Sequence, residues 1–198
     1  MSSPDNSDKI NALLADIPQS GNGLGEPVAP VTLDYFGDLQ CPFCRDFSLD
    51  VLPSIVQRWV RSGTLRIEYR ALQTATHEPN VFVAQHVAAL AAGKQERAWQ
   101  FVETFYAEQG EEGTGYVNEA YLEGIASQIP DLDLSRWATE RKDPDLVREI
   151  AGDAEAAGNA GLTGTPSFLL GPSGGATRTF SPSGRTSFDA AIEGLVGA

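Results

Sequence analysis

Cysteine, histidine and methionine are scarce in this sequence, and that scarcity limits the chemistry available to it. The 198 residues include only two cysteines, two histidines and one methionine. A zinc site built on the two cysteines would have to recruit His77 and His86, which lie nine residues apart, whereas paired zinc-binding histidines are usually about three to five apart. A metal site is therefore the weaker interpretation of the cysteines. A purely structural disulfide is also disfavoured, because closing so short a loop removes little entropy from the unfolded chain.

Basic residues are also few. The 14 Lys and Arg residues stand against 27 Asp and Glu residues, which gives a formal net charge of −13. Nucleic acid and anionic membranes both require clustered Lys and Arg, so we expect neither as a partner. No apolar stretch approaches the length of a membrane span, and the N-terminus lacks a basic and then apolar export signal. The polar segment 1–8 is compatible with a natural start, or with what remains after an export signal or membrane anchor has been removed.

The informative feature that is present is the unit Cys-Pro-Phe-Cys at residues 41–44. Residues 31–36 are rich in β-branched and aromatic side chains and precede a Gly-Asp pair, which predicts a buried strand that ends in a turn. After the second cysteine, apolar residues recur at helical spacing: Phe47, Val51, Leu52, Ile55, Val56, Trp59 and Val60. Cys41 should therefore lie at or just before the start of a helix, where Pro42 costs no intrahelical hydrogen bond. Pro53 lies deep in the same pattern and should kink the helix.

This placement predicts a redox pair. Unpaired backbone N–H groups and the positive end of the helix dipole favour the thiolate of Cys41, and the thiolate is the reactive form of cysteine. The spacing of the pair lets Cys44 reach Cys41 within one turn and resolve a mixed disulfide formed there. We expect Cys41 to be the exposed, more acidic thiol and Cys44 to be the sheltered one.

The rest of the chain is organised around this unit. With 41% hydrophobic residues, the chain can bury a substantial core. The pattern predicts four segments: an N-terminal helix and flexible linker (1–25), the first part of the main fold (26–77), a helical insertion (78–158) and the second part of the main fold (159–198). Within the second segment, a strand at 66–72 should run parallel to the first strand. The expected helices lie at 10–17, 81–92, 98–108, 118–128, 134–139, 144–158 and 187–196, with late strands near 167–170 and 176–181.

A Thr-Pro dipeptide, Thr165-Pro166, stands immediately before the late strand. The order of strand, CPFC unit, long helix, strand and then Thr-Pro before a late strand resembles the thioredoxin fold, in which a cis-proline loop faces the redox pair. Cys44 and Pro166 are further apart than thioredoxin itself requires. In this respect the chain resembles the DsbA-like branch, in which a helical domain interrupts the thioredoxin fold. Segments 29–33 and 37–44 also look like the bacterial DsbA-like thiol-disulfide oxidoreductases, and the resemblance covers roughly residues 24 to 197.

The resemblance implies an α/β protein, with a thioredoxin fold and an inserted helical domain, that exchanges thiols and disulfides with substrate proteins. Cys41 and Cys44 would be catalytic, without any cofactor or metal. Pro42, Phe43, Thr165 and Pro166 would contact the substrate, and the Thr165–Pro166 peptide bond would be cis. We expect a monomer that acts outside the cytoplasm or in the cell envelope, with the cytoplasm as the alternative. Its electron partner would be a membrane oxidase of the DsbB or vitamin K epoxide reductase type.

Two departures from the family pattern bear on the reaction. Many relatives have a buried carboxylate six residues before the first cysteine, which relays protons to the resolving thiol, and Tyr35 occupies that position here. Asp34 should not replace the carboxylate, because successive strand residues face opposite sides. Glu68 is a candidate substitute, with a plain surface charge as the alternative. Phe43 stands where DsbA has a histidine, so Cys41 should be less acidic than in DsbA and the disulfide less oxidising.

The direction of electron flow stays open at this stage. A moderate oxidase is the favoured hypothesis, and a disulfide reductase or isomerase with the same catalytic residues is the first alternative. The second alternative belongs to a different class: a peptide-binding chaperone module that carries the CPFC unit without turnover.

Overall fold

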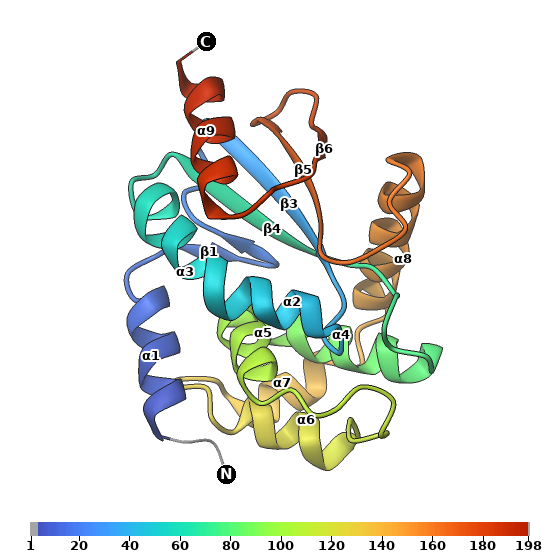
Figure 1. The fold of residues 1–198 in the computed structure, drawn as a ribbon. Coiled ribbons are helices and arrows are strands. Elements are labelled where there is room, and N and C mark those ends of the chain that lie inside the picture. The colour runs from blue at the N-terminus through green and yellow to red at the C-terminus, as the bar shows by residue number, and fades with distance from the viewer. Residues whose placement is uncertain (1–3, 198) are drawn as a thin grey trace.

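The computed structural model describes residues 4–197 and places its strands in one mixed sheet (Figure 1). The strands of this part of the chain are β1 (Gln19–Ser20), β2 (Gly23–Leu24), β3 (Val31–Gly37), β4 (Leu65–Ala71), β5 (Ser167–Pro172) and β6 (Arg178–Phe180). Their order in the sheet is β1-β2-β4-β3-β5-β6. The central strand β3 runs parallel to β4, which confirms the predicted crossover, and antiparallel to β5.

The segment 19–25 is not the flexible linker that the sequence predicted. Its two short strands form a hairpin, and β2 pairs antiparallel with β4, so the hairpin extends the sheet. Gly21 makes the turn with φ +58, a conformation in which glycine carries no side-chain strain. Leu24 is completely buried. Strands of two residues are too short to show an alternating pattern, and pairing with β4 supplies the order that the local sequence lacks.

The helical run that begins at Pro42, between the two cysteines, is broken into four short parts. They are α2 (Pro42–Asp46), η1 (Phe47–Val51), α3 (Leu52–Ile55) and η2 (Val56–Val60), and both η segments are π-helical. The N–H of Leu52 bonds to the carbonyl of Phe47, five residues back, immediately before Pro53. Proline has no N–H to continue the α pattern, and π turns are a usual accommodation in such places. The sequence predicted a kink at Pro53, and the structure has π turns on both sides of it.

Helices outside this run follow the sequence prediction closely, except the first. That helix begins at Pro4 and ends at Leu14 instead of spanning 10–17, because the backbone leaves the helical conformation at Asp16, where φ is +60. The helices outside the run are α1 (Pro4–Leu14), α4 (Pro79–Gly93), α5 (Ala98–Ala107), α6 (Glu119–Ala126), α7 (Leu134–Glu140), α8 (Pro144–Asn159) and α9 (Arg185–Val196). Helices α4 to α8 fall between β4 and β5 in the chain, and α4 to α7 gather below the sheet in Figure 1. Among the described helices, none combines the length and the apolar character that a membrane crossing needs.

The two faces of the sheet are held by different forces. On one face, the aromatic rings of Tyr35, Phe47, Phe168 and Phe188 pack at centroid distances of 4.8 to 5.7 Å, which fastens the helix after the cysteines to the strands. On the other face, Arg70 bridges Asp34 at 2.7 Å and Asp153 of α8 at 3.0 Å. As expected from strand alternation, Asp34 thus lies on the face away from the cysteines.

Candidate active site

Cys41 lies at the junction between sheet and helix that the sequence predicted. It is the N-cap residue of α2, in an extended conformation with φ −76 and ψ 121. The expectation that it is exposed is wrong, because only 4% of the residue is accessible. Two segments far away in the chain cover it: the Thr165 loop, and Gln109 after α5, whose amide donates to the carbonyls of Leu39 (2.8 Å) and Cys41 (3.1 Å).

The two thiols have opposite shifts in pKa. For Cys41, a hydrogen bond from Cys44 is the largest influence, and with further bonds from Thr165 and the N–H groups of Cys44 and Phe43 it outweighs burial and lowers the pKa from 9.0 to about 6. For Cys44, burial dominates, and its bond to Cys41 and the charge of that sulfur raise the pKa further. Both residues are free cysteines in this structure. The predicted order of acidity is therefore present, and its causes are the hydrogen bonds to Cys41 and the burial of Cys44.

The Thr-Pro loop lies against the cysteine pair. The thiol of Cys41 donates to the carbonyl of Thr165 at 3.4 Å, and the Thr165–Pro166 peptide bond is cis. The Thr165 hydroxyl bonds to that of Thr74 at 2.5 Å, which joins this loop to the one after β4. Phe43, between the cysteines, leaves 70% of its surface exposed although it is a large apolar residue. An exposed aromatic ring beside the reactive thiol offers a contact surface for another polypeptide.

A second polar group near the site, Asp38, was not singled out from the sequence. Its carboxylate is fully buried and accepts from the N–H groups of Thr74 (2.9 Å), Ala75 (2.9 Å) and Thr76 (2.8 Å). Burial alone would raise its pKa, but the charge of His86 and the bonds from Thr76 and Thr74 lower it overall. Asp38 thus fixes the loop that leads into Cys41. Its position in a Gly-Asp turn just before the cysteines was the available signal.

Tyr35 and Glu68, which the sequence raised in connection with proton transfer to Cys44, lie on opposite faces of the sheet. Tyr35 points to the cysteine side, where its hydroxyl donates to the carbonyl of Cys44 at 3.4 Å and also meets the Cys44 side chain. Glu68 is not a substitute for the family carboxylate. It pairs with Arg66 at 2.5 Å and is level with Asp34 in the parallel register, on the opposite face of the sheet.

The two histidines do not meet at the cysteines. His86 is 99% buried and bonds through its ring to the carbonyl of Phe82 (2.8 Å) and the hydroxyl of Tyr69 (3.3 Å). Within residues 4–197, no group of three or more His, Cys, Asp or Glu side chains is arranged to hold a metal ion.

This arrangement, a cysteine pair at a helix start facing a Thr-Pro loop on a sheet with a helical insertion, defines the class of DsbA-like thioredoxin-fold proteins. Comparisons with known proteins agree. The family model described as Thioredoxin matches residues 19–179. The oxidised crystal structure of BdbD from Bacillus subtilis superposes with a TM-score of 0.76, covering 91% of this chain and 99% of that one at 17% identity.

Two curated proteins also match this chain in sequence. "Probable disulfide bond formation protein D" of Bacillus cereus is 25% identical over 169 residues, which are 84% of this chain and 76% of the relative. "Na(+)/H(+) antiporter NhaA 1" of Salinispora arenicola is 31% identical over 161 residues, 81% of this chain but only 23% of that protein. The chain belongs to the thioredoxin family. It is a DsbA-like thiol-disulfide oxidoreductase.

Proposed function

We propose that this protein is an oxidase that introduces disulfide bonds into substrate proteins, with Cys41 as the nucleophile and Cys44 as the resolving thiol. The observation that carries the proposal is the contrast between the two thiols, since the Cys41 pKa is lowered to about 6 while burial raises that of Cys44. A stabilised Cys41 thiolate makes the reduced pair a good product of substrate oxidation, because stabilising the reduced form makes the disulfide more oxidising.

The reaction would begin with the pair as a disulfide. A substrate thiolate attacks the Cys41 sulfur, and Cys44 leaves with the electron pair of the broken S–S bond and takes up a proton. A second substrate thiolate then attacks the substrate sulfur of the mixed disulfide, and Cys41 leaves as a thiolate. The substrate gains one disulfide, and the protein gains two electrons in its reduced pair.

The substrate would lie over the exposed Phe43 ring and along the Thr165–Pro166 loop, with Pro42 beside it. These residues surround Cys41 and come from two distant parts of the chain. The name of the Bacillus relatives, disulfide bond formation protein D, supports protein thiols as the substrate class. We infer that the chain acts as a monomer in an extracytoplasmic or cell-envelope setting. A membrane oxidase of the DsbB or vitamin K epoxide reductase type would reoxidise it.

Equilibration with glutathione buffers tests the direction. An oxidase should give a potential between those of thioredoxin and DsbA, roughly −270 to −120 mV. A value at or below that of thioredoxin would instead favour a reductase. Turnover on a reduced protein substrate, compared with peptide binding, separates both from a chaperone: Cys41→Ala should abolish turnover and leave peptide binding intact. If Cys41→Ala keeps the full effect on substrate refolding, the chaperone alternative is correct.

A further inference from the structure

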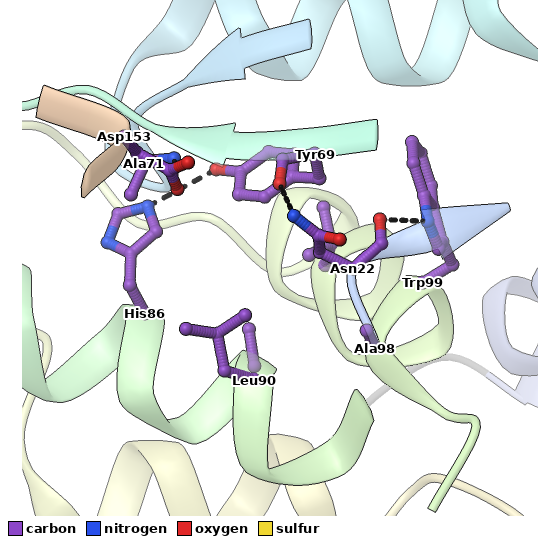
Figure 2. Close-up of a pocket in the computed structure, with 10 residues that line it drawn as sticks. Asn22, Tyr69, Ala71, His86, Leu90, Ala98, Trp99 and Asp153 are labelled. Carbon is purple, nitrogen blue, oxygen red and sulfur yellow. Dashed lines mark hydrogen bonds between the residues drawn. The ribbon is translucent and has the colours of Figure 1, made fainter. Parts of the chain in front are cut away.

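A hydrogen-bond chain of four ring side chains starts beside the resolving cysteine and leads into the helical insertion. The Tyr35 hydroxyl donates to the carbonyl of Cys44 at 3.4 Å, is a neighbour of the Cys44 side chain, and lies 3.3 Å from the hydroxyl of Tyr106. Tyr106 lies 3.2 Å from the hydroxyl of Tyr69, and Tyr69 lies 3.3 Å from Nε2 of His86. The hydrogen-bond chain thus joins one ring side chain from each of four elements, β3, α5, β4 and α4. Figure 2 shows its far end, with the His86 ring directed from α4 toward the Tyr69 hydroxyl.

The hydrogen bonds of His86, at the far end of the hydrogen-bond chain, determine which group donates at each step. Nδ1 of His86 lies 2.8 Å from the carbonyl of Phe82, and a carbonyl can only accept, so Nδ1 carries the hydrogen. In the neutral ring Nε2 is then an acceptor, and Tyr69 donates to it. The Tyr69 oxygen can accept from Tyr106, and the Tyr106 oxygen can accept from Tyr35. The Tyr106 hydroxyl also reaches the carbonyl of Asp38 at 3.3 Å, so its hydrogen can turn between two acceptors.

Water does not offer an alternative route to Cys44. Cys44, Tyr35 and Tyr106 have no accessible surface, and His86 and Tyr69 are 1% and 5% exposed. The cavity beside Tyr69 and His86 has a volume of about 10 Å³. That is close to the minimum space for a single water. A proton that leaves or reaches the Cys44 sulfur must therefore pass through protein groups.

Asp38, Asp34 and Glu68 are not placed to take the proton, and Glu103, whose pKa burial raises to about 8, is already protonated at neutral pH. Asp38 is already bonded by several backbone N–H groups, which favour its charged form. Glu68 and Asp34 belong to the opposite face of the sheet. Tyr35, the first residue of the hydrogen-bond chain, occupies the position at which the family resemblance implies a carboxylate.

We propose that Tyr35, Tyr106, Tyr69 and His86 form a proton relay that serves Cys44 in place of the family's buried carboxylate. The inference rests on the proposed roles of the two cysteines. When Cys44 resolves a mixed disulfide, its S–H bond breaks and the proton passes to the Tyr35 oxygen. Each tyrosine hands its own hydrogen to the next group, and His86 Nε2 receives the last one. The Cys44 electron pair forms the new bond to the Cys41 sulfur, and the bound partner leaves as a thiolate. The reverse shift protonates Cys44 when it is the leaving group.

The charges around His86 suit a transient imidazolium. Asp38, from the loop after β3, acts on it electrostatically, and Asp153 of α8 lines the same small cavity. Tyr69 of β4 is the remaining titratable neighbour, and burial raises its pKa well above the ordinary value, so it stays a neutral donor. Burial lowers the pKa of His86, and the charge of Asp38 partly offsets that effect. His86 is therefore neutral at rest, and its Nε2 accepts the hydrogen bond from Tyr69.

The relay can be tested in the reduced full-length protein with glutathione disulfide as the probe. Quenched-flow mass spectrometry separates the first step, attack by Cys41 to give the glutathione mixed disulfide, from the second, resolution by Cys44. At pH 7, Tyr106→Phe and Tyr35→Phe should slow resolution at least tenfold, because general acid–base steps typically contribute about 10² to 10⁴-fold, and should leave the first step unchanged. The deficit should shrink as pH rises, since hydroxide can then remove the proton directly. The double variant should be no slower than the slower single one, since one break already interrupts the relay.

Tyr121→Phe is the matched control. The Tyr121 hydroxyl donates to the carbonyl of Glu108 at 3.1 Å and takes no part in the hydrogen-bond chain. This variant should resolve at the rate of the unaltered protein. Wild-type resolution rates in both relay variants at every pH, or an equal loss in Tyr121→Phe, would overturn the relay. If the unaltered protein never forms the mixed disulfide, the proposed oxidoreductase roles fail first and the relay fails with them.

Discussion

The two thiols of the active-site pair are one helical turn apart, yet their surroundings act on them in opposite ways. Cys41 receives hydrogen bonds, and its pKa is lowered to about 6, whereas Cys44 lies behind it where burial raises the pKa. Their accessible fractions, 4% and 0%, are almost the same. At two sulfurs with so little accessible surface, the hydrogen bonds that Cys41 receives outweigh burial, and burial prevails at Cys44.

Two buried carboxyl groups repeat the contrast. Asp38 accepts from three consecutive N–H groups, and its pKa is lowered despite burial. Glu103 of α5 accepts from Ser48 of η1 at 2.5 Å. Burial outweighs that bond and raises the Glu103 pKa from 4.5 to about 8. Counting donors thus separates a carboxylate that stabilises the fold in its charged form from one that is best kept protonated.

The largest expected effect is the selectivity of alkylation. In the reduced protein, iodoacetamide should modify Cys41 with a midpoint near pH 6 and leave Cys44 unmodified below pH 9. The thiolate populations at pH 5 should differ by roughly a thousandfold or more. Peptide mapping across pH measures both sites.

A pair of variants sharpens this point, because the bond from Cys44 is the largest influence on Cys41. Cys44→Ala should raise the Cys41 midpoint, and Cys44→Ser, which keeps a hydroxyl donor, should raise it less. Preferential labelling of Cys44, or an unchanged midpoint in Cys44→Ala, would contradict the assignment.

The next effect concerns stability and pH through Glu103. Its folded pKa lies above the unfolded value, so its contribution is complete below about pH 4.5 and is lost as pH rises through about 8. The contribution of this group to the free energy of unfolding of the unaltered protein should fall over this window by roughly 5 kcal/mol. Glu103→Gln should remove this dependence of the free energy of unfolding on pH, and at pH 9 it should be more stable than the unaltered protein.

Urea unfolding at pH 5, 7 and 9 measures the Glu103 effect. Glu155→Gln, on the exposed side of α8, is the control and should change nothing. If the free energy of unfolding of Glu103→Gln falls with pH as steeply as that of the unaltered protein, Glu103 is not the source of the effect.

Asp38→Asn should act in the opposite direction and somewhat more weakly. The new amide group would face N–H donors and leave at least one of them unsatisfied, which costs about 2–3 kcal/mol at pH 7. Because the Asp38 pKa is lowered in the folded state, the charged form stabilises the protein above its ordinary pKa, and the benefit is lost as pH falls. The variant should therefore converge with the unaltered protein in acid. An equal loss of unfolding free energy at pH 3 and pH 7 would contradict this origin.

The smallest expected effect is on the reduction potential. Phe43→His would place a hydrogen-bonding ring between the cysteines, lower the Cys41 pKa and make the potential more positive by roughly 30 mV, equivalent to about 1.4 kcal/mol. Phe43→Leu, which adds no donor, should leave it almost unchanged. Equilibrium with glutathione measures both, and equal shifts in the two variants would show that the ring acts by bulk alone.

Local signals in the sequence were sufficient for most of the fold. The strand before the cysteines, the Pro42 helix start, the helices of the insertion and the Asp143 cap of α8 each depend on neighbours within a few residues, and each is present. The hairpin at 19–25 was missed because its order comes from pairing with β4, more than forty residues away.

The local sequence was enough to predict that Cys41 starts a helix and that Cys44 follows one turn later, and the family resemblance implied that Tyr35 stands where many relatives have a carboxylate. The surroundings of these three residues depend on the packing of distant segments. This packing covers Cys41 with Gln109 and Thr165, and it brings Tyr106, Tyr69 and His86 into line behind Tyr35. Tyr106 looked like an ordinary core residue of the insertion, because its pattern shows that it is buried but not which polar atom its hydroxyl meets. Hydrogen bonds between elements distant in the chain depend on packing geometry, and no local periodicity encodes that geometry.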